Sequence, residues 1–318
     1  MNNFNTPESE GAVVPIVSNT VDRDMVLVTF VADSVCLGSH WIYDRDQITE
    51  CLPDGVSALE APRSGYHGGK GAGDLTHHGD QALVLLESLT KRKSWSQENW
   101  LEDWKAYWAL DPNSYKDSAT SDTLANHEKG IHNPSRSHDF SAVSRLGPLL
   151  AFLSDTALDE QITGARSYVE ATHGDPLVSD SAEWLVRTLY LLRKGVGFRD
   201  AFEAAVEQRT YTQEFGISYR KGVRALKKSA DESISGLGQS CNISNALPLT
   251  VWMALTYEDH PVEMLQHNAL AGGDNAARGM VLGLLIAAQG KFDQLPESWT
   301  QGLNTLARIN QALEELGK

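Results

Sequence analysis

The sequence has few cysteines, and they are far apart. Only Cys36, Cys51 and Cys241 occur in 318 residues. A disulfide framework or a cysteine-rich zinc site needs more cysteines at closer spacing. An odd number of thiols also suits a reducing compartment, where disulfides are rare. The cysteines therefore predict a cytoplasmic protein that is stabilised by its core rather than by cross-links.

Basic residues are also scarce. The chain has 27 Lys and Arg against 42 Asp and Glu, which gives a formal net charge of −15. A field of this sign repels nucleic acids and anionic membranes, so we expect neither as a partner. One small phosphate-containing ligand is still compatible with this charge, because helix N-termini bind phosphate.

Long apolar segments are missing as well. No run of apolar residues reaches the roughly 20 residues that a membrane-spanning helix needs. Residues 1–20 are polar and contain no Lys or Arg, so they are interpreted as a flexible N-terminal tail rather than a signal peptide. With 41% hydrophobic residues, positions 21–318 can bury a large core, and we predict a single domain there.

Strand patterns are almost absent, because no alternation of apolar and polar residues is bounded by turns. Apolar residues instead recur at helical spacing, for example over 25–37, 178–193 and 280–288. Trp100, Trp104 and Trp108 share one helical face and are expected in the core. Residues 45–78 and 111–140 are expected to be loops. The sequence therefore predicts an all-α fold.

The most informative segment runs from Asn268 to Gly290. Gly272 and Gly273 interrupt the chain, and Asp274 follows where a buried helix can begin. Its side chain could cap that helix or point into a cleft at the helix mouth. Within the helix, Gly279 and Gly283 recur four residues apart, which lets another helix approach closely.

Asp80 repeats this layout, since it follows Gly79 and precedes the apolar run that begins at Ala82. The same two roles, helix cap or cleft carboxylate, are open to it. The adjacent His77 and His78 are expected to point in different directions and not to form a metal pair. If Asp80 and Asp274 share a site, their loops must meet at one end of the helical bundle.

Polar and aromatic residues also follow the first apolar helix. Asp33 interrupts that helix, and His40-Trp41-Ile42-Tyr43 comes just after Gly38. These rings could line a pocket or plug the core. Arg145 lies in an apolar context and needs an acidic partner or a phosphate.

Four blocks of sequence carry a resemblance to a known family. They are Ala32-Asp33-Ser34 continuing to His40-Trp41-Ile42-Tyr43-Asp44, Gly79-Asp80-Gln81, the segment 141–148 around Arg145, and Gly272-Gly273-Asp274-Asn275-Ala276-Ala277-Arg278-Gly279. Together they resemble the ADP-ribosylglycohydrolase family, and within it the branch that includes the J-type crystallins. The resemblance runs from about Met25 to Gly290 and implies a single compact bundle of orthogonal helices.

The resemblance also implies a metal site. Family members hold two magnesium ions with a Thr-Asp-Asp run and an Asp-x-Asp-Thr run. By position, His78-Gly79-Asp80 stands at the first run and the segment from Asp274 to Ala277 at the second. Asp80 and Asp274 are thus the implied metal ligands, and two carboxylates suit one Mg²⁺ better than two. A family glutamate near the first helix aligns with His40.

By this resemblance the protein hydrolyses an ADP-ribosyl glycosidic bond, and its partner is an ADP-ribose-containing small molecule or an ADP-ribosylated protein. The implied catalytic residues are Asp80, Asp274 and His40. The implied substrate-binding residues are Asp33, Trp41, Tyr43, His78, Gln81, Arg145, Asn268, Gly273 and Arg278. In the alternative interpretation, the protein binds ADP-ribose or a related nucleotide without cleaving it, or serves as a crystallin-like structural protein. The sequence does not set the oligomeric state.

Overall fold

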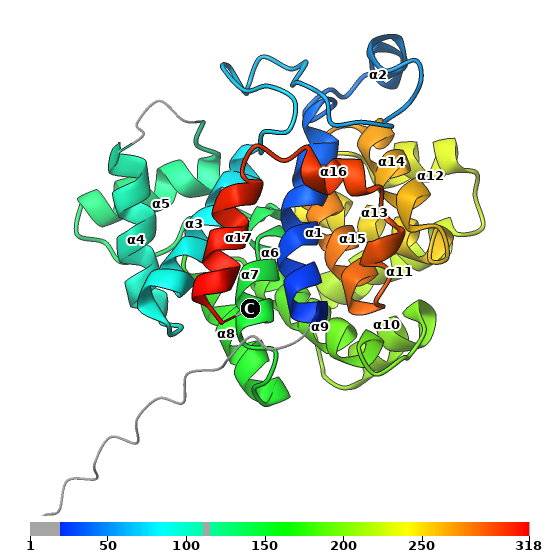
Figure 1. The fold of residues 1–318 in the computed structure, drawn as a ribbon. Coiled ribbons are helices and arrows are strands. Elements are labelled where there is room, and N and C mark those ends of the chain that lie inside the picture. The colour runs from blue at the N-terminus through cyan, green and yellow to red at the C-terminus, as the bar shows by residue number, and fades with distance from the viewer. Residues whose placement is uncertain (1–19, 111–114, 318) are drawn as a thin grey trace, which may run out of the picture.

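The computed structural model describes residues 20–110 and 115–317, so the predicted tail lies almost wholly outside the described part. Figure 1 shows a bundle of helices that cross at many angles. The α-helices are α1 (Thr20–Leu37), α2 (Arg45–Cys51), α3 (His77–Arg92), α4 (Gln97–Leu110), α5 (Ser118–Glu128), α6 (Ser141–Ser144), α7 (Gly147–Phe152), α8 (Leu158–Glu170), α9 (Pro176–Leu192), α10 (Phe198–Glu207), α11 (Gln213–Ala225), α12 (Ala230–Leu237), α13 (Ile243–Thr256), α14 (Pro261–Ala271), α15 (Asn275–Ala288), α16 (Glu297–Gln301) and α17 (Leu306–Glu315). A 3₁₀ turn, η1, covers Phe292–Gln294.

No strand forms in the described residues; the β-pairing there consists of two isolated bridges, Ser135 with His173 and Asp139 with Asn242. The all-α prediction is therefore confirmed. In the same residues, no helix combines the length and the apolarity needed to cross a membrane.

Helices α1 and α15 form the centre of the bundle and pack against each other (Figure 1). Small residues allow this approach. A Cβ added at Gly283 would lie 3.0 Å from the Cβ of Ala32 and 3.0 Å from a methyl group of Val28. At Gly279 it would lie 2.8 Å from the sulfur of Cys36. The predicted close packing along the glycine face is thus confirmed.

The tryptophan face of α4 packs into the core as predicted, since Trp100, Trp104 and Trp108 are all buried. The indole N–H of Trp104 donates to the Gln81 side-chain oxygen at 2.9 Å, which joins α4 to α3. Helices α4 and α5 lie on one side of the centre, and α10 to α12 on the other (Figure 1).

Several helix boundaries differ from the sequence expectation. Helix α3 begins at His77 rather than at Ala82, and Thr76 is its cap, because the Thr76 hydroxyl accepts the His78 N–H at 3.1 Å. Asp80 therefore does not cap a helix. Asp274 precedes α15, but its side chain makes no capping hydrogen bond. The expected loop over 111–140 contains α5, which Asp117 caps through the Thr120 N–H at 2.7 Å.

Candidate functional site

A cleft opens where the end of α1 and the starts of α3, α5 and α6 come together. Its volume is about 200 Å³, and its lining mixes aromatic rings with imidazole, carboxylate and hydroxyl groups. The lining residues are Trp41, Tyr43, Tyr66, His77, His78, Tyr115, Asp117, Ser118, Asp139, Ser141 and Cys241. Residues from distant parts of the sequence thus share one cavity, as ligand sites require.

The turn after α1 is tied to the glycine loop before α15. The Trp41 N–H donates to the Gly273 carbonyl at 2.8 Å, and the Gly273 N–H donates to the Ile42 carbonyl at 2.7 Å. Trp41 has a φ of 61°, and Gly272 and Gly273 have φ of 68° and 62°. Glycine adopts this left-handed region at little cost, which explains the Gly-Gly pair. The two segments therefore hold Trp41 and Asp274 in a fixed relation.

Asp274 is fully buried, and histidines surround its carboxylate. The Nε2 of His78 lies 3.1 Å from Asp274 Oδ1, and the Nε2 of His40 lies 3.9 Å from the same oxygen. Because an ionised carboxylate only accepts hydrogen bonds, His78 donates its Nε2–H to Asp274. The other oxygen, Oδ2, has no hydrogen-bond partner. Asp274 itself does not line the cleft but lies behind His78, which does.

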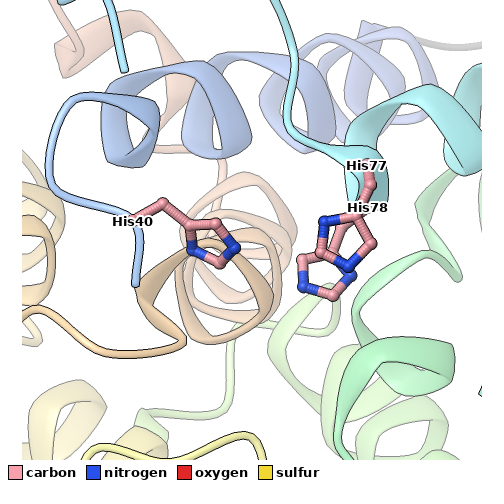
Figure 2. Close-up of side chains that lie close together, drawn as sticks. All are labelled: His40, His77 and His78. Carbon is pink, nitrogen blue, oxygen red and sulfur yellow. The ribbon is translucent and has the colours of Figure 1, made fainter. Parts of the chain in front are cut away.

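Three imidazoles gather at this point. His40, His77 and His78 each offer a nitrogen, and these atoms all lie within 4.8 Å of one another. Figure 2 shows His40 extending from the end of α1 toward the two histidines at the start of α3. The expectation that His77 and His78 point apart is wrong, since their ring centroids are only 3.8 Å apart. Successive helical residues are about 100° apart around the axis, not on opposite sides of it. Two long side chains can therefore bend toward each other.

The environment keeps most of these rings neutral. Burial, with smaller contributions from His78, His67 and His77, holds the pKa of His40 well below its usual value. Burial also lowers the pKa of His77 to about 4 and that of His67 to about 3. Burial acts in the same direction on His78, but the Asp274 carboxylate outweighs it, so the pKa of His78 is raised. These shifts favour the neutral form of His40, His77 and His67, and the catalytic role predicted for His40 stays a prediction.

Two further carboxylates, Asp117 and Asp139, line the cleft. Asp117 Oδ2 lies 3.5 Å from the Nε2 of His77. Asp139 accepts hydrogen bonds from His173 Nε2 at 2.8 Å and from the backbone N–H of Ser141 at 3.0 Å. Burial opposes the ionisation of Asp139, but His173 and its hydrogen-bond donors hold its pKa well below the usual range. Carboxylates therefore contribute negative charge to the lining of the cleft.

Exposed aromatic rings surround the mouth. Tyr43, Tyr66 and Tyr115 are 51%, 53% and 36% exposed, although large aromatic side chains are normally buried. Trp41 lies among them, with ring centroids 4.8 Å from Tyr66 and 4.9 Å from Tyr115. Such a set of flat, accessible rings suits a planar group such as a nucleobase.

Of the residues predicted from the sequence, Trp41, Tyr43 and His78 line the cleft. Asp274 and His40 adjoin it through His78, as their contact with that residue and the ring packing of His40 against it show. Gly273 shapes the adjoining loop through its backbone.

The other predicted residues contact different parts of the molecule. Asp80 pairs with Lys70 at 2.5 Å, and Asp33 binds Thr76 beneath the start of α3. Gln81 is occupied by Trp104, and Arg145 is buried with a hydrogen bond to Ser141 at 3.3 Å. The contact that joins α3 to Asp274 comes from His78, and the roles predicted for Asp80 and Arg145 stay predictions.

Arg278 donates hydrogen bonds within the protein, and its predicted role in binding substrate stays a prediction. Its guanidinium donates to the Gly272 carbonyl at 2.6 Å and to the Gln239 carbonyl at 3.3 Å, and its Nε donates to Asn268 at 3.1 Å. Burial lowers its pKa to about 10. In this arrangement Arg278 and Asn268 stabilise the glycine loop.

The donor atoms around Asp274 do not suit magnesium. Mg²⁺ takes about six oxygen ligands in near-octahedral geometry. Here Asp80 is paired with Lys70, Asp274 Oδ1 is bound by His78, and the unpaired atoms are largely imidazole nitrogens. At the start of α3, His77 and His78 line the cleft, whereas Asp80 is not among the lining residues.

Comparison with known proteins identifies the family. The model of the ADP-ribosylglycohydrolase family matches residues 23–318, so the chain belongs to this family of hydrolases. A solved structure titled "ADP-ribosylglycohydrolase-related protein complex" superposes with a TM-score of 0.67 at 18% identity, covering 94% of this chain and 98% of that one. At this identity the likeness establishes the fold alone. No curated protein sequence matches the chain.

Sequence reasoning missed several lining residues, chiefly Tyr66, His77, Tyr115, Asp117, Asp139 and Ser141. All of them lie in or beside segments expected to be loops. A usable signal was present, because exposed aromatic residues and histidines within long glycine-rich loops are typical of binding segments.

Proposed function

We propose that the chain hydrolyses an ADP-ribosyl glycosidic bond in this cleft. The observation that carries the proposal is the buried Asp274, which contacts the cleft-lining His78 and whose second oxygen has no hydrogen-bond partner. The cavity, of about 200 Å³, has imidazole, carboxylate and hydroxyl groups in its lining and exposed aromatic rings at its mouth. The distal ribose therefore enters, and the adenine stays at the mouth among Trp41, Tyr66 and Tyr115.

In the proposed reaction, the Asp274 Oδ2 accepts a proton from water while the water oxygen bonds to the anomeric carbon. The bond from that carbon to the acceptor atom breaks, and the acceptor takes up a proton at the open mouth. The ribose ring gathers positive charge in the transition state, as in other glycoside hydrolyses. Asp274, Asp117 and Asp139 stabilise this charge because they are fixed in place before the reaction.

The test is release of ADP-ribose from peptides modified on arginine or on serine. We expect turnover by the wild type and a loss of at least about 100-fold in Asp274→Asn, comparable with removal of a preorganised catalytic group. Asp259→Asn is the control, since that carboxylate is exposed and pairs with Lys291. Equal rates for wild type and Asp274→Asn would contradict the proposal. Asp80→Asn in the same assay tests the catalytic role predicted for that residue.

Binding without cleavage is the second candidate function. It is favoured by the pairing of Asp80 with Lys70 and of Arg278 with backbone carbonyls, because both side chains are then engaged within the protein. It predicts calorimetric binding of ADP-ribose with no turnover, and a change in affinity alone in Asp274→Asn. A crystallin-like structural role predicts neither binding nor turnover.

A further inference from the structure

Three buried imidazoles lie close to one another. His40 is fully buried, and His77 and His78 are each only 2% exposed. Their candidate ligand atoms all lie within 4.8 Å of one another, and they come from two separate elements (Figure 2). The site therefore depends on the tertiary fold and not on a local sequence motif.

The hydrogen bonds of His40 fix the direction of its free nitrogen. Asn275 uses its amide N–H groups on the Ser39 hydroxyl at 2.8 Å and the Ala269 carbonyl at 3.0 Å. Its Oδ1 therefore accepts from His40 Nδ1 at 3.0 Å, so Nδ1 carries the proton. The remaining nitrogen, Nε2, holds a lone pair and has no hydrogen-bond partner.

The two histidines of α3 follow the same scheme. His78 donates its Nε2–H to Asp274, and its Nδ1 is buried without a partner. His77 has its Nε2 beside Asp117 at 3.5 Å, and its Nδ1 is also buried without a partner. In metalloproteins, the non-ligating nitrogen of a histidine ligand is usually oriented in this way by a carboxylate or carbonyl group.

From this geometry we infer that His40, His77 and His78 bind one transition-metal ion of the zinc class. Imidazole suits Zn²⁺ and its neighbours, whereas Mg²⁺ prefers oxygen. Zn–N bonds of about 2.0 Å put tetrahedral nitrogens about 3.3 Å apart, so the rings close by small rotations. Because His77 and His78 also line the cleft, water or substrate from the cleft would supply a fourth ligand, as in catalytic zinc sites.

The alternative is a purely structural cluster of neutral rings. It leaves several buried nitrogens without a hydrogen-bond partner, which is unfavourable for a buried polar group. A metal ion accounts for all three lone pairs at once. The inferred metal site adjoins the cleft of the proposed function. It rests on that function only for what the fourth coordination position of the metal would bind. Metal binding is therefore measured without any ADP-ribosyl compound.

The experiment uses the full chain after treatment with a chelator. Calorimetric titration with Zn²⁺ is expected to show one equivalent, and an excess of Mg²⁺ is expected not to compete. Titration with Co²⁺ is expected to give visible absorption bands of a tetrahedral ion, a readout that needs no variant. Absence of Zn²⁺ binding, or full competition by Mg²⁺, would overturn the inference whether or not the protein is a hydrolase.

Variants locate the ion. His40→Ala and His77→Gln are expected to weaken Zn²⁺ binding by more than Asn275→Ala, for which loss of the supporting hydrogen bond predicts about 10–100-fold. His67→Gln is the matched control, because this buried ring stacks on His40 but lies outside the three-histidine group. Unchanged affinity in His40→Ala and His77→Gln would overturn the assignment. An equal loss in His67→Gln would also do so, since it would indicate disturbed packing.

Discussion

Asp33 binds Thr76 twice, accepting both its backbone N–H and its hydroxyl hydrogen. Thr76 in turn caps α3 through the His78 N–H. A buried carboxylate of α1 thus sets the first turn of α3, where His77 and His78 begin. Burial raises the pKa of Asp33, and the hydrogen bonds from Thr76 oppose that effect. Asp33 is therefore a positioning residue for the cleft.

This relationship predicts the effect of removing the hydroxyl. Thr76→Val keeps the shape of the side chain but removes the cap and one partner of a buried carboxylate. We expect the free energy of unfolding to fall by about 2–4 kcal/mol, the sum of a lost cap and an unsatisfied acceptor. Urea denaturation measures this change. Thr76→Ser retains the hydroxyl and should lose much less; similar losses in both variants would contradict the role of the hydroxyl.

The aromatic rings at the mouth of the cleft predict that removal of one ring weakens ligand binding. Tyr66→Ala removes an exposed ring that packs edge-on against Trp41. We expect ADP-ribose to bind about tenfold more weakly, because stacking of a base on an aromatic ring contributes about 1–3 kcal/mol. Calorimetry checks this value. Tyr66→Phe keeps the ring and should bind as the wild type does; a matching loss there would point to the hydroxyl instead of stacking.

The space around two helical glycines predicts opposite effects of an added methyl group on stability. Gly283→Ala places a methyl group against Ala32 and Val28, so we expect a loss of about 1–3 kcal/mol in the free energy of unfolding. Gly236→Ala in α12 meets only the end of Lys228, at 3.8 Å, and should stabilise by up to about 1 kcal/mol. Thermal or urea unfolding of both variants tests the prediction. A neutral Gly283→Ala would show that the helices can separate at little cost.

An ion-pair network between α3 and α4 predicts that the free energy of unfolding depends on pH. Burial alone would raise the pKa of Asp103, but hydrogen bonds from Arg92, Lys91 and Ser88 hold it well below its usual value. A depressed carboxyl pKa stabilises the fold above the unfolded pKa of about 3.9, and this contribution is lost as the pH falls below it. Asp103→Asn should therefore cost about 1 kcal/mol at pH 7 and progressively less below about pH 4.

Unfolding curves between pH 3 and pH 7 measure this difference. Glu102→Gln is the control, because Glu102 is more exposed and bonds to Arg92 alone, at 3.1 Å. Its effect should remain below that of Asp103→Asn at pH 7. A difference between Asp103→Asn and wild type that does not change with pH would show that the charge of Asp103 is not the cause.

The helical architecture followed from the sequence because apolar spacing is a local property. The faces of α4 and α15 could be predicted from Trp104 and Gly283, which recur with their neighbours every four residues. The start of α3 was placed too late, because Thr76 caps it through a short polar turn whose partner, Asp33, lies in α1. Such a contact joins residues far apart in the sequence and leaves no periodic pattern.

Only part of the site could be predicted, because local patterns reveal some of its residues and long-range contacts determine the others. Asp274 was recognised from its glycine loop, and His40 from its place after α1. The meeting of His77 with His40 depends on how α1 and α3 cross, which the residues alone do not specify. The charge of Arg278 indicated a phosphate ligand, but its contact with the Gly272 carbonyl depends on a positive-φ loop and could not be predicted from charge.

The pairing of α1 with α15 has a consequence for biosynthesis. α1 ends at Leu37, whereas its main partner begins at Asn275. At roughly 5–20 residues per second, the ribosome delivers α15 tens of seconds after α1. Until then the apolar surface of α1 lacks its main packing partner, so the nascent chain is expected to need a chaperone until α15, in the last seventh of the polypeptide, has emerged.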